Sequence, residues 1–279
     1  METSNRILQK NKLIHSGMDG FANIELVSDK NSRTFIKNLK TKSPVLVQKA
    51  LYSDPTKPNK AHIYLMSSAG GMLQGDTMKI DIIARKNTET YVTTQSATKI
   101  HKTENRSSSQ HVKILVEKES LLEYLPKQII PHKHAKFFQN VNIRIEKSST
   151  LIFSEIISAG RIAYGERFDF NSVRLRLNCT DQDNKILFSE SVNLKPENNK
   201  IKFNSLFGNQ NLYSTIYIIS QKINSEKLCL KIYDFFKTNS LIGCSQLPNN
   251  SGVVIRILSN SIDEINDSIS TIRKLTHNH

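Results

Sequence analysis

The segment Ser67–Asp76 concentrates chemistry-bearing residue types, because it holds three of the chain's ten glycines in six residues and ends on a carboxylate. Gly70, Gly71 and Gly75 lie between two strand-like runs, where glycine indicates positive φ or a close backbone approach. A Walker loop has Lys-Ser/Thr after its last glycine, and a dinucleotide fingerprint leads into a helix, whereas Asp76 and a strand follow here. Asp76 therefore either ties a turn through backbone N–H groups or faces a polar cavity as a cation-binding or proton-bearing carboxylate.

A second polar cluster, Thr93–His101, combines four hydroxyls with an amide, a lysine and a histidine at the end of a strand. The hydroxyls Thr94, Ser96 and Thr98 have no nearby acid, and Ser96 with Lys99 lacks the partner motifs of a Ser-x-x-Lys hydrolase. The cluster is more typical of a strand end that lines a water-filled space than of a nucleophilic site.

A third cluster begins at Glu155, which interrupts the otherwise apolar strand 151–157. This carboxylate is either paired across a sheet or directed into a polar interior. The following Gly160-Arg161 and Gly165-Glu166 predict a turn, with Arg161 and Glu166 as an ion pair across it. An exposed pair of this kind contributes little stability.

Two histidines form a weaker candidate metal site. His132 and His134 would point to one face of a strand and offer two nitrogens to a metal, but no third ligand is evident and surface histidines are the commoner explanation. No catalytic triad, carboxylate dyad or cofactor loop emerges, so the sequence indicates a non-enzymatic protein.

The elements that position these clusters are mainly strands. Short β-rich runs recur at roughly 8–20-residue spacing from residue 20 to about 195, which favours an antiparallel all-β architecture. The last eighty residues add two amphipathic helices. The first has Leu228, Ile232, Phe235 and Phe236 behind a Ser225 cap, and the second has an apolar stripe from Ile262 to Leu275 behind a capping box of Ser261 and Glu264. No linker or repeat divides the chain, so we expect a single domain over residues 1–279.

Composition narrows the class of protein. The 279 residues have a mean hydropathy of −0.40 and no long apolar run, so we expect no transmembrane helix, and the N-terminus has no signal-peptide pattern, which makes the cytoplasm the default location. Three widely spaced cysteines favour free thiols. The net charge of +14 is concentrated in residues 1–150, with 24 Lys and Arg against 13 Asp and Glu, which suits solvated sheet faces, an acidic protein partner or nucleic acid.

Four motifs taken in order resemble the urease accessory protein family UreD, called UreH in some bacteria. They are Gly70-Gly71…Gly75-Asp76, Thr93-Thr94-Gln95…Thr98-Lys99, Leu122-Glu123-Tyr124-Leu125-Pro126 and Gly160-Arg161…Gly165-Glu166-Arg167-Phe168. The resemblance runs from about residue 20 to 275. The chain departs from the family in Ser67-Ser68-Ala69, in Ile100-His101 after the Thr-Lys pair, and in Tyr124 where tryptophan is frequent.

The resemblance implies a mainly β, helicoidal sheet scaffold with a few helices. It also implies a urease maturation factor that binds urease apoprotein together with UreF-type and UreG-type (GTPase) accessory proteins. Nickel would pass through a polar internal path and would not be bound permanently. Oxygen ligands bind nickel weakly enough to let it move on.

On this basis we expect Asp76, Glu155, Thr98, Thr94 and Ser96 to line the path. Gly70, Gly71, Gly75, Gly160 and Gly165 would be structural, and Arg161 and Glu166 would lie at a partner surface. Two alternatives stay open: a basic β-rich nucleic-acid-binding protein, and a hydrolase that pairs Asp76 with Glu155 within about 5–10 Å.

Overall fold

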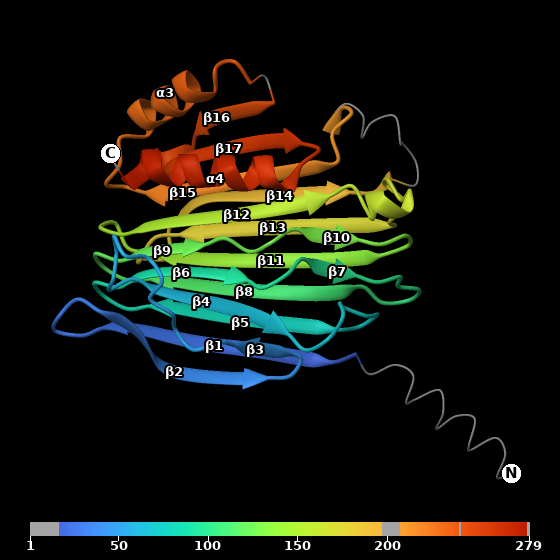
Figure 1. Cartoon of the computed structure of the whole chain (residues 1–279), viewed down its shortest axis with the longest axis horizontal. Helices are drawn as coiled ribbons and strands as arrows, with labels where there is room; N and C mark the ends of the chain where they lie inside the picture. Colours follow the sequence, from blue (N-terminus) through green and yellow to red (C-terminus); the bar gives the residue numbers. More distant parts are fainter. Residues whose placement is uncertain (1–16, 197–206, 240, 278–279) are drawn as a thin grey trace, which may run out of the picture.

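The computed structural model describes residues 17–196, 207–239 and 241–277, which form two β-sheets and two α-helices (Figure 1). The first sheet has the strand order β14-β13-β11-β8-β5-β1-β2. Its strands are β1 (Asp19–Ser28), β2 (Thr34–Lys42), β5 (Thr77–Ala84), β8 (Ser108–Val116), β11 (Lys136–Ile145), β13 (Ser172–Thr180) and β14 (Ile186–Leu194).

The second sheet follows the order β16-β17-β15-β12-β9-β6-β4-β3, with two short strands, β7 and β10, beside this path. Its strands are β3 (Val45–Val47), β4 (Ala61–Ser67), β6 (Glu89–Thr94), β7 (Thr98–Ile100), β9 (Leu121–Tyr124), β10 (Ile129–Pro131), β12 (Thr150–Ser158), β15 (Leu212–Ser220), β16 (Ile242–Gln246) and β17 (Gly252–Ser259). The helical elements are α3 (Ser225–Phe236), α4 (Ile262–His277) and the 3₁₀ turns η1 (Ile162–Tyr164) and η3 (Pro248–Asn250).

The chain builds the two sheets together as a solenoid. From β4 to β13 it passes repeatedly from one sheet to the other, and each passage adds a strand beside the previous strand of that sheet. As a result β1, β5, β8, β11 and β13 pair in parallel in the first sheet, and β4, β6, β9 and β12 pair in parallel in the second.

The mainly β, helicoidal scaffold expected from the sequence is confirmed, but antiparallel pairing of the central strands is wrong. Antiparallel pairs are found at the outer parts of the sheets, such as β1 with β2, β13 with β14, and β12 with β15. The reason is that alternation of apolar and polar residues is the same in parallel and antiparallel strands, so it does not report strand direction.

One hydrophobic core fills the space between the sheets. Its side chains come from the inward positions of both sheets, such as Ile82, Val112, Val141 and Phe153, all of which are almost fully buried. A row of stacked rings joins Tyr124, Phe153, Tyr217 and Phe188, with neighbouring ring centroids 5.7–5.9 Å apart. This core fixes the spacing of the two sheets.

A second core lies between the outer face of the second sheet and the helices, which Figure 1 shows beside β15, β16 and β17. The expected stripe of α4 is confirmed, since Ile265, Ile269 and Ile272 are buried there. In α3, Leu228 and Ile232 are buried, whereas the expected core residue Phe235 is 59% exposed.

The helix caps differ in detail from those expected. Asn224, rather than Ser225, caps α3, because its side chain accepts a hydrogen bond from the Lys227 N–H at 2.9 Å. At α4 the Ser261 hydroxyl accepts from the Glu264 N–H at 3.4 Å, as a capping box requires, but the Glu264 carboxylate accepts from Ser259. Ser261 thus caps α4 as expected, but its own N–H donates to Ser259 at 2.9 Å rather than to Glu264.

The three cysteines are free thiols, as expected: Cys179 is buried, and Cys229 and Cys244 are half-buried with their sulfur atoms 2.9 Å apart. None of the helices in the described part of the chain is long and apolar enough to span a membrane.

Candidate functional site: three adjoining cavities

The parallel strands of the second sheet bring the polar clusters together at one edge. The carboxyl ends of parallel neighbours meet at the same edge of a sheet. The glycine segment follows β4, the hydroxyl cluster follows β6, Pro126 and Lys127 follow β9, and the Gly160 turn follows β12. Clusters that are separated in sequence by whole strands are thus neighbours in the fold.

Backbone hydrogen bonds join the glycine segment to the hydroxyl cluster. The Met72 N–H donates to the Lys99 carbonyl at 2.8 Å, and the His101 N–H donates to the Met72 carbonyl at 2.9 Å. Gly75 has φ of +81°, a conformation that favours glycine. A Cβ on Gly17 would lie 2.1 Å from the Gly75 carbonyl carbon, so the two backbones touch at this point.

The carboxylate of Asp76 is engaged by this turn. Oδ1 accepts a hydrogen bond from the Met18 N–H at 2.8 Å, and Oδ2 accepts one from the Leu73 N–H at 2.7 Å. Asp76 is buried and is not among the described residues that line the cavities below. The geometry fits the turn-tying alternative, and a role for Asp76 in the nickel path stays a prediction.

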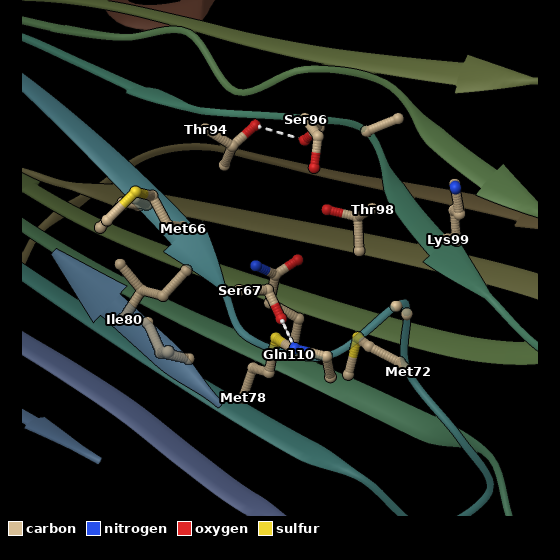
Figure 2. Close-up of a pocket in the computed structure, with 16 residues that line it drawn as sticks. Met66, Ser67, Met72, Met78, Ile80, Thr94, Ser96, Thr98, Lys99 and Gln110 are labelled. Carbon is tan, nitrogen blue, oxygen red and sulfur yellow. Dashed lines mark hydrogen bonds between the residues drawn. The ribbon is translucent and has the colours of Figure 1, made fainter. Parts of the chain in front are cut away.

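A cavity of about 190 Å³, called here the glycine cavity, opens between the glycine segment and the hydroxyl cluster (Figure 2). Gly70 and Gly71 form part of its wall, and the side chains around it include Thr94, Ser96 and Thr98 from the second sheet and Gln110 from β8 of the first. Three of the five methionines, Met66, Met72 and Met78, also line it, together with other apolar side chains and Lys99. Three of the predicted path residues therefore share one cavity.

A smaller cavity of about 20 Å³, the Glu155 cavity, lies deeper between the sheets and shares Thr94, Thr98 and Gln110 with the glycine cavity. Its volume is enough for about one water molecule. Gln139 and Glu155 line it, and the Gln139 amide donates a hydrogen bond of 2.5 Å to Glu155 Oε1. Thus four of the five predicted path residues, all except Asp76, line two adjoining cavities.

Burial changes the acidity of Glu155. Removal from water raises the pKa of Glu155 to about 8, and the nearby Glu190 adds to this effect, while the hydrogen bond from Gln139 opposes it. At neutral pH the carboxyl group therefore holds its proton most of the time. A cation that bound here would displace that proton, which couples metal binding to proton release.

A third cavity of about 200 Å³, the helix cavity, lies between the second sheet and α4. It shares Pro126, Lys127, Ser154 and Ile156 with the Glu155 cavity. The pairing of β9 with β12 ends at Tyr124 opposite Phe153, so the sheet has no ladder between β9 and β12 beyond this point. The Ser154 hydroxyl is buried without a hydrogen-bond partner at this junction. The three cavities thus adjoin one another through shared wall residues, the first two between the sheets and the third between the second sheet and α4.

The turn after β12 is ordered by the predicted ion pair. Arg161 Nε lies 2.8 Å from Glu166 Oε2, Arg161 Nη2 contacts Glu166 Oε1, and Glu166 Oε2 also accepts from the Lys133 N–H at 3.0 Å. The hydrogen bonds from Arg161 lower the pKa of Glu166. Beside the pair, the Tyr164 ring is 77% exposed and lies 4.9 Å from the Arg161 guanidinium. A role as partner surface stays a prediction for Arg161 and Glu166.

Gly160 should be intolerant of a side chain. Its φ is +144°, and a Cβ there would lie 2.6 Å from the Glu166 carbonyl oxygen. We expect Gly160→Ala to lower the free energy of unfolding by about 1–3 kcal/mol, from backbone strain alone, in urea denaturation. Gly243→Ala is the matched control, because a Cβ at Gly243 would have open space around it. Equal stability of the two variants would contradict this account of the turn. Gly165, with φ of +73°, also has the left-handed conformation.

Sequence reasoning missed the glutamines. Gln110 and Gln139 are register partners on β8 and β11, and both are buried on the face that bears Val112 and Val141. A polar residue in the inward register of an apolar strand is the signal that could have identified them, as it identified Glu155.

The histidine pair proposed from sequence is wrong as a strand pair. β10 ends at Pro131, before His132, and His134 has φ of +63° in the following turn. The two rings therefore do not share a strand face. His132 instead packs against the ring of His101.

Comparison with known proteins identifies the scaffold that carries these cavities. Residues 19–279 match the family described as UreD urease accessory protein. The urease accessory protein UreD of Cenarchaeum symbiosum (strain A) is 30% identical over 236 residues, which cover 84% of this chain and 83% of that protein.

Two further relatives have similar sequence identity and coverage. Urease accessory protein UreD 2 of Brucella canis is 33% identical over 230 residues, covering 81% of this chain and 76% of that protein. UreD of Photorhabdus laumondii subsp. laumondii is 31% identical over 245 residues, covering 86% and 76%. The chain belongs to the UreD family of urease accessory proteins.

Proposed function

We propose that this protein acts in urease maturation as a scaffold that binds urease apoprotein with UreF-type and UreG-type accessory proteins, and that it passes nickel through the three cavities. Membership of the UreD family supports the role in maturation over the nucleic-acid alternative. The single observation that supports the path is that each cavity shares lining residues with the next, from the glycine segment to α4.

The chemistry of the lining suits transit. Hydroxyl, amide and carboxyl oxygens of Thr94, Thr98, Gln110 and Glu155 are hard, weak ligands for Ni²⁺, so an ion is bound briefly and released. Of the described residues that line the Glu155 cavity, Glu155 is the one carboxylate, and it is therefore the group that can neutralise the charge of the ion at the narrowest point.

The path is tested by replacing Glu155 in the co-expressed urease operon. We expect Glu155→Gln to preserve assembly of the accessory complex and to reduce the nickel content and activity of purified urease about tenfold or more, since only the carboxylate is lost. Glu155→Asp should restore part of the activation. The matched control is Glu104→Gln, because Glu104 has a 69% exposed side chain and pairs with Lys102 at the surface.

The possible outcomes distinguish a role of Glu155 in nickel passage from a role in the structure of the protein. Loss of co-purification with the partners would show that Glu155 is structural, and full nickel loading by an assembled Glu155→Gln complex would show that nickel does not need this carboxylate. Asp76→Asn belongs in the same series, because its carboxylate is held by backbone N–H groups and we expect its effect to be on protein yield.

A further inference from the structure

The rings of His101 and His132 contact each other beside the glycine cavity. β7 and β10 pair in parallel with Ile100 opposite Pro131, and the His132 N–H donates to the Ile100 carbonyl at 2.9 Å. His101 and His132, which directly follow these two strands, are therefore placed side by side. The ring centroids lie 4.7 Å apart with an interplanar angle of 77°.

This pair lies against the cavity wall. A Cβ at Gly71 would come within 2.7 Å of His101 Nε2, so the ring occupies the space beside that glycine. Gly71, Met72 and Lys99 line the cavity, and the backbone of Met72 is hydrogen-bonded to the strand that carries His101. The His101 ring thus lies against Gly71 of the cavity wall, and the His132 ring contacts His101.

Positive charges lie close to the pair. Arg161 and Lys99 are near His132, and Glu166 opposes their effect. Imidazole is a preferred ligand of Ni²⁺. The same positive charges keep the affinity for a cation modest.

The number of ligands also indicates weak binding. In residues 17–196, 207–239 and 241–277 no group of three His, Cys, Asp or Glu side chains could hold a metal ion. A metal bound at the pair would therefore have at most one nitrogen from each ring, and water would complete its coordination. Two imidazoles attract Ni²⁺ more strongly than water and hydroxyls do, but they do not enclose it.

We propose that His101 and His132 form a two-imidazole loading site at which Ni²⁺ is held before it enters the glycine cavity. The inference rests on the proposed nickel transfer. It adds a first binding point with nitrogen ligands to a path whose interior ligands are oxygens.

The binding test uses the purified full chain and Ni²⁺ alone, measured by isothermal titration calorimetry. We expect His101→Ala and His132→Ala each to raise the Kd of one Ni²⁺ about tenfold or more, with little further change in the double variant, since one remaining imidazole is no chelate. The matched control, His111→Ala, removes a histidine of the first sheet that contacts Phe138. An unchanged titration of the double variant would overturn the proposal.

A second measurement needs no substitution at the pair. In the wild-type chain labelled with ¹⁵N-histidine, substoichiometric paramagnetic Ni²⁺ should broaden two of the eight imidazole signals first, those of His101 and His132. Broadening that begins at other histidines would contradict the loading site even where the variants fold poorly. Both measurements are independent of urease activation. If wild-type His101 and His132 bind Ni²⁺ as expected while the Glu155→Gln variant still activates urease fully, the path through the Glu155 cavity is disproved and the loading site is retained.

Discussion

Replacement of Glu123 by alanine should lower the free energy of unfolding by about 3–5 kcal/mol, because it leaves buried positive charge without its partner. The Glu123 side chain is fully buried. Its Oε2 lies 2.8 Å from Lys60 Nζ and 2.6 Å from Arg273 Nη2, and its Oε1 lies 2.8 Å from His277 Nε2. Urea denaturation followed by circular dichroism measures the loss.

The expected loss of stability follows from the interactions that keep the buried Glu123 carboxylate ionised. Burial opposes its ionisation, but hydrogen bonds from His277 and Arg273 and the charge of Lys60 hold the pKa of Glu123 well below its usual value. Lys60 is 2% exposed, and its other carboxylate, Glu89, is 3.8 Å away. Without Glu123 the lysine stays buried and poorly paired, and the C-terminal turn of α4 loses its attachment to β9.

Two further variants make this prediction specific. Glu119→Ala removes an exposed ion pair with Lys222 and should leave the free energy of unfolding almost unchanged. The double variant Glu123→Leu, Lys60→Met should recover much of the stability, because it also removes the buried charge of Lys60 and leaves only the partly exposed Arg273 and His277 without the carboxylate. A Glu123→Ala protein as stable as Glu119→Ala would show that the cluster does not hold α4.

The stability of the wild-type protein relative to Glu155→Gln should fall as the pH rises from about 5 to 8. The carboxyl pKa is raised from 4.5 to about 8 in the folded protein, so between these values the folded state keeps a proton that the unfolded state has lost. Stability then decreases with pH by up to about 1.4 kcal/mol per unit, and the penalty is complete above the folded-state pKa. The amide of the Glu155→Gln variant does not titrate, so that variant lacks this contribution to the pH dependence.

The measurement compares urea denaturation of both proteins at several pH values, so that all other titrating groups cancel. Glu104→Gln serves again as the exposed control. Parallel curves for wild type and Glu155→Gln would mean that Glu155 is ionised in the folded protein. The same buried proton predicts tighter Ni²⁺ binding in the Glu155 cavity at pH 8 than at pH 6.

The sequence by itself determined the β-rich scaffold, the two C-terminal helices and the positions of the polar clusters. Period-two apolar patterns indicate strands whatever their partners are, and Glu155 stands out because it interrupts such a pattern. The glycines and hydroxyls were recognisable because their chemistry differs from that of their neighbours. These signals are local, so they can be read without knowing the fold.

Only the tertiary structure decided which of those clusters lie together. Parallel pairing of β4, β6, β9 and β12 brings their carboxyl ends to one edge, and strand direction depends on contacts between distant segments that a local pattern does not record. The same contacts tie Asp76 to Met18, place Gln139 against Glu155, and set His132 beside His101 rather than His134. Side-chain partners follow from register, and register is a property of the assembled sheets.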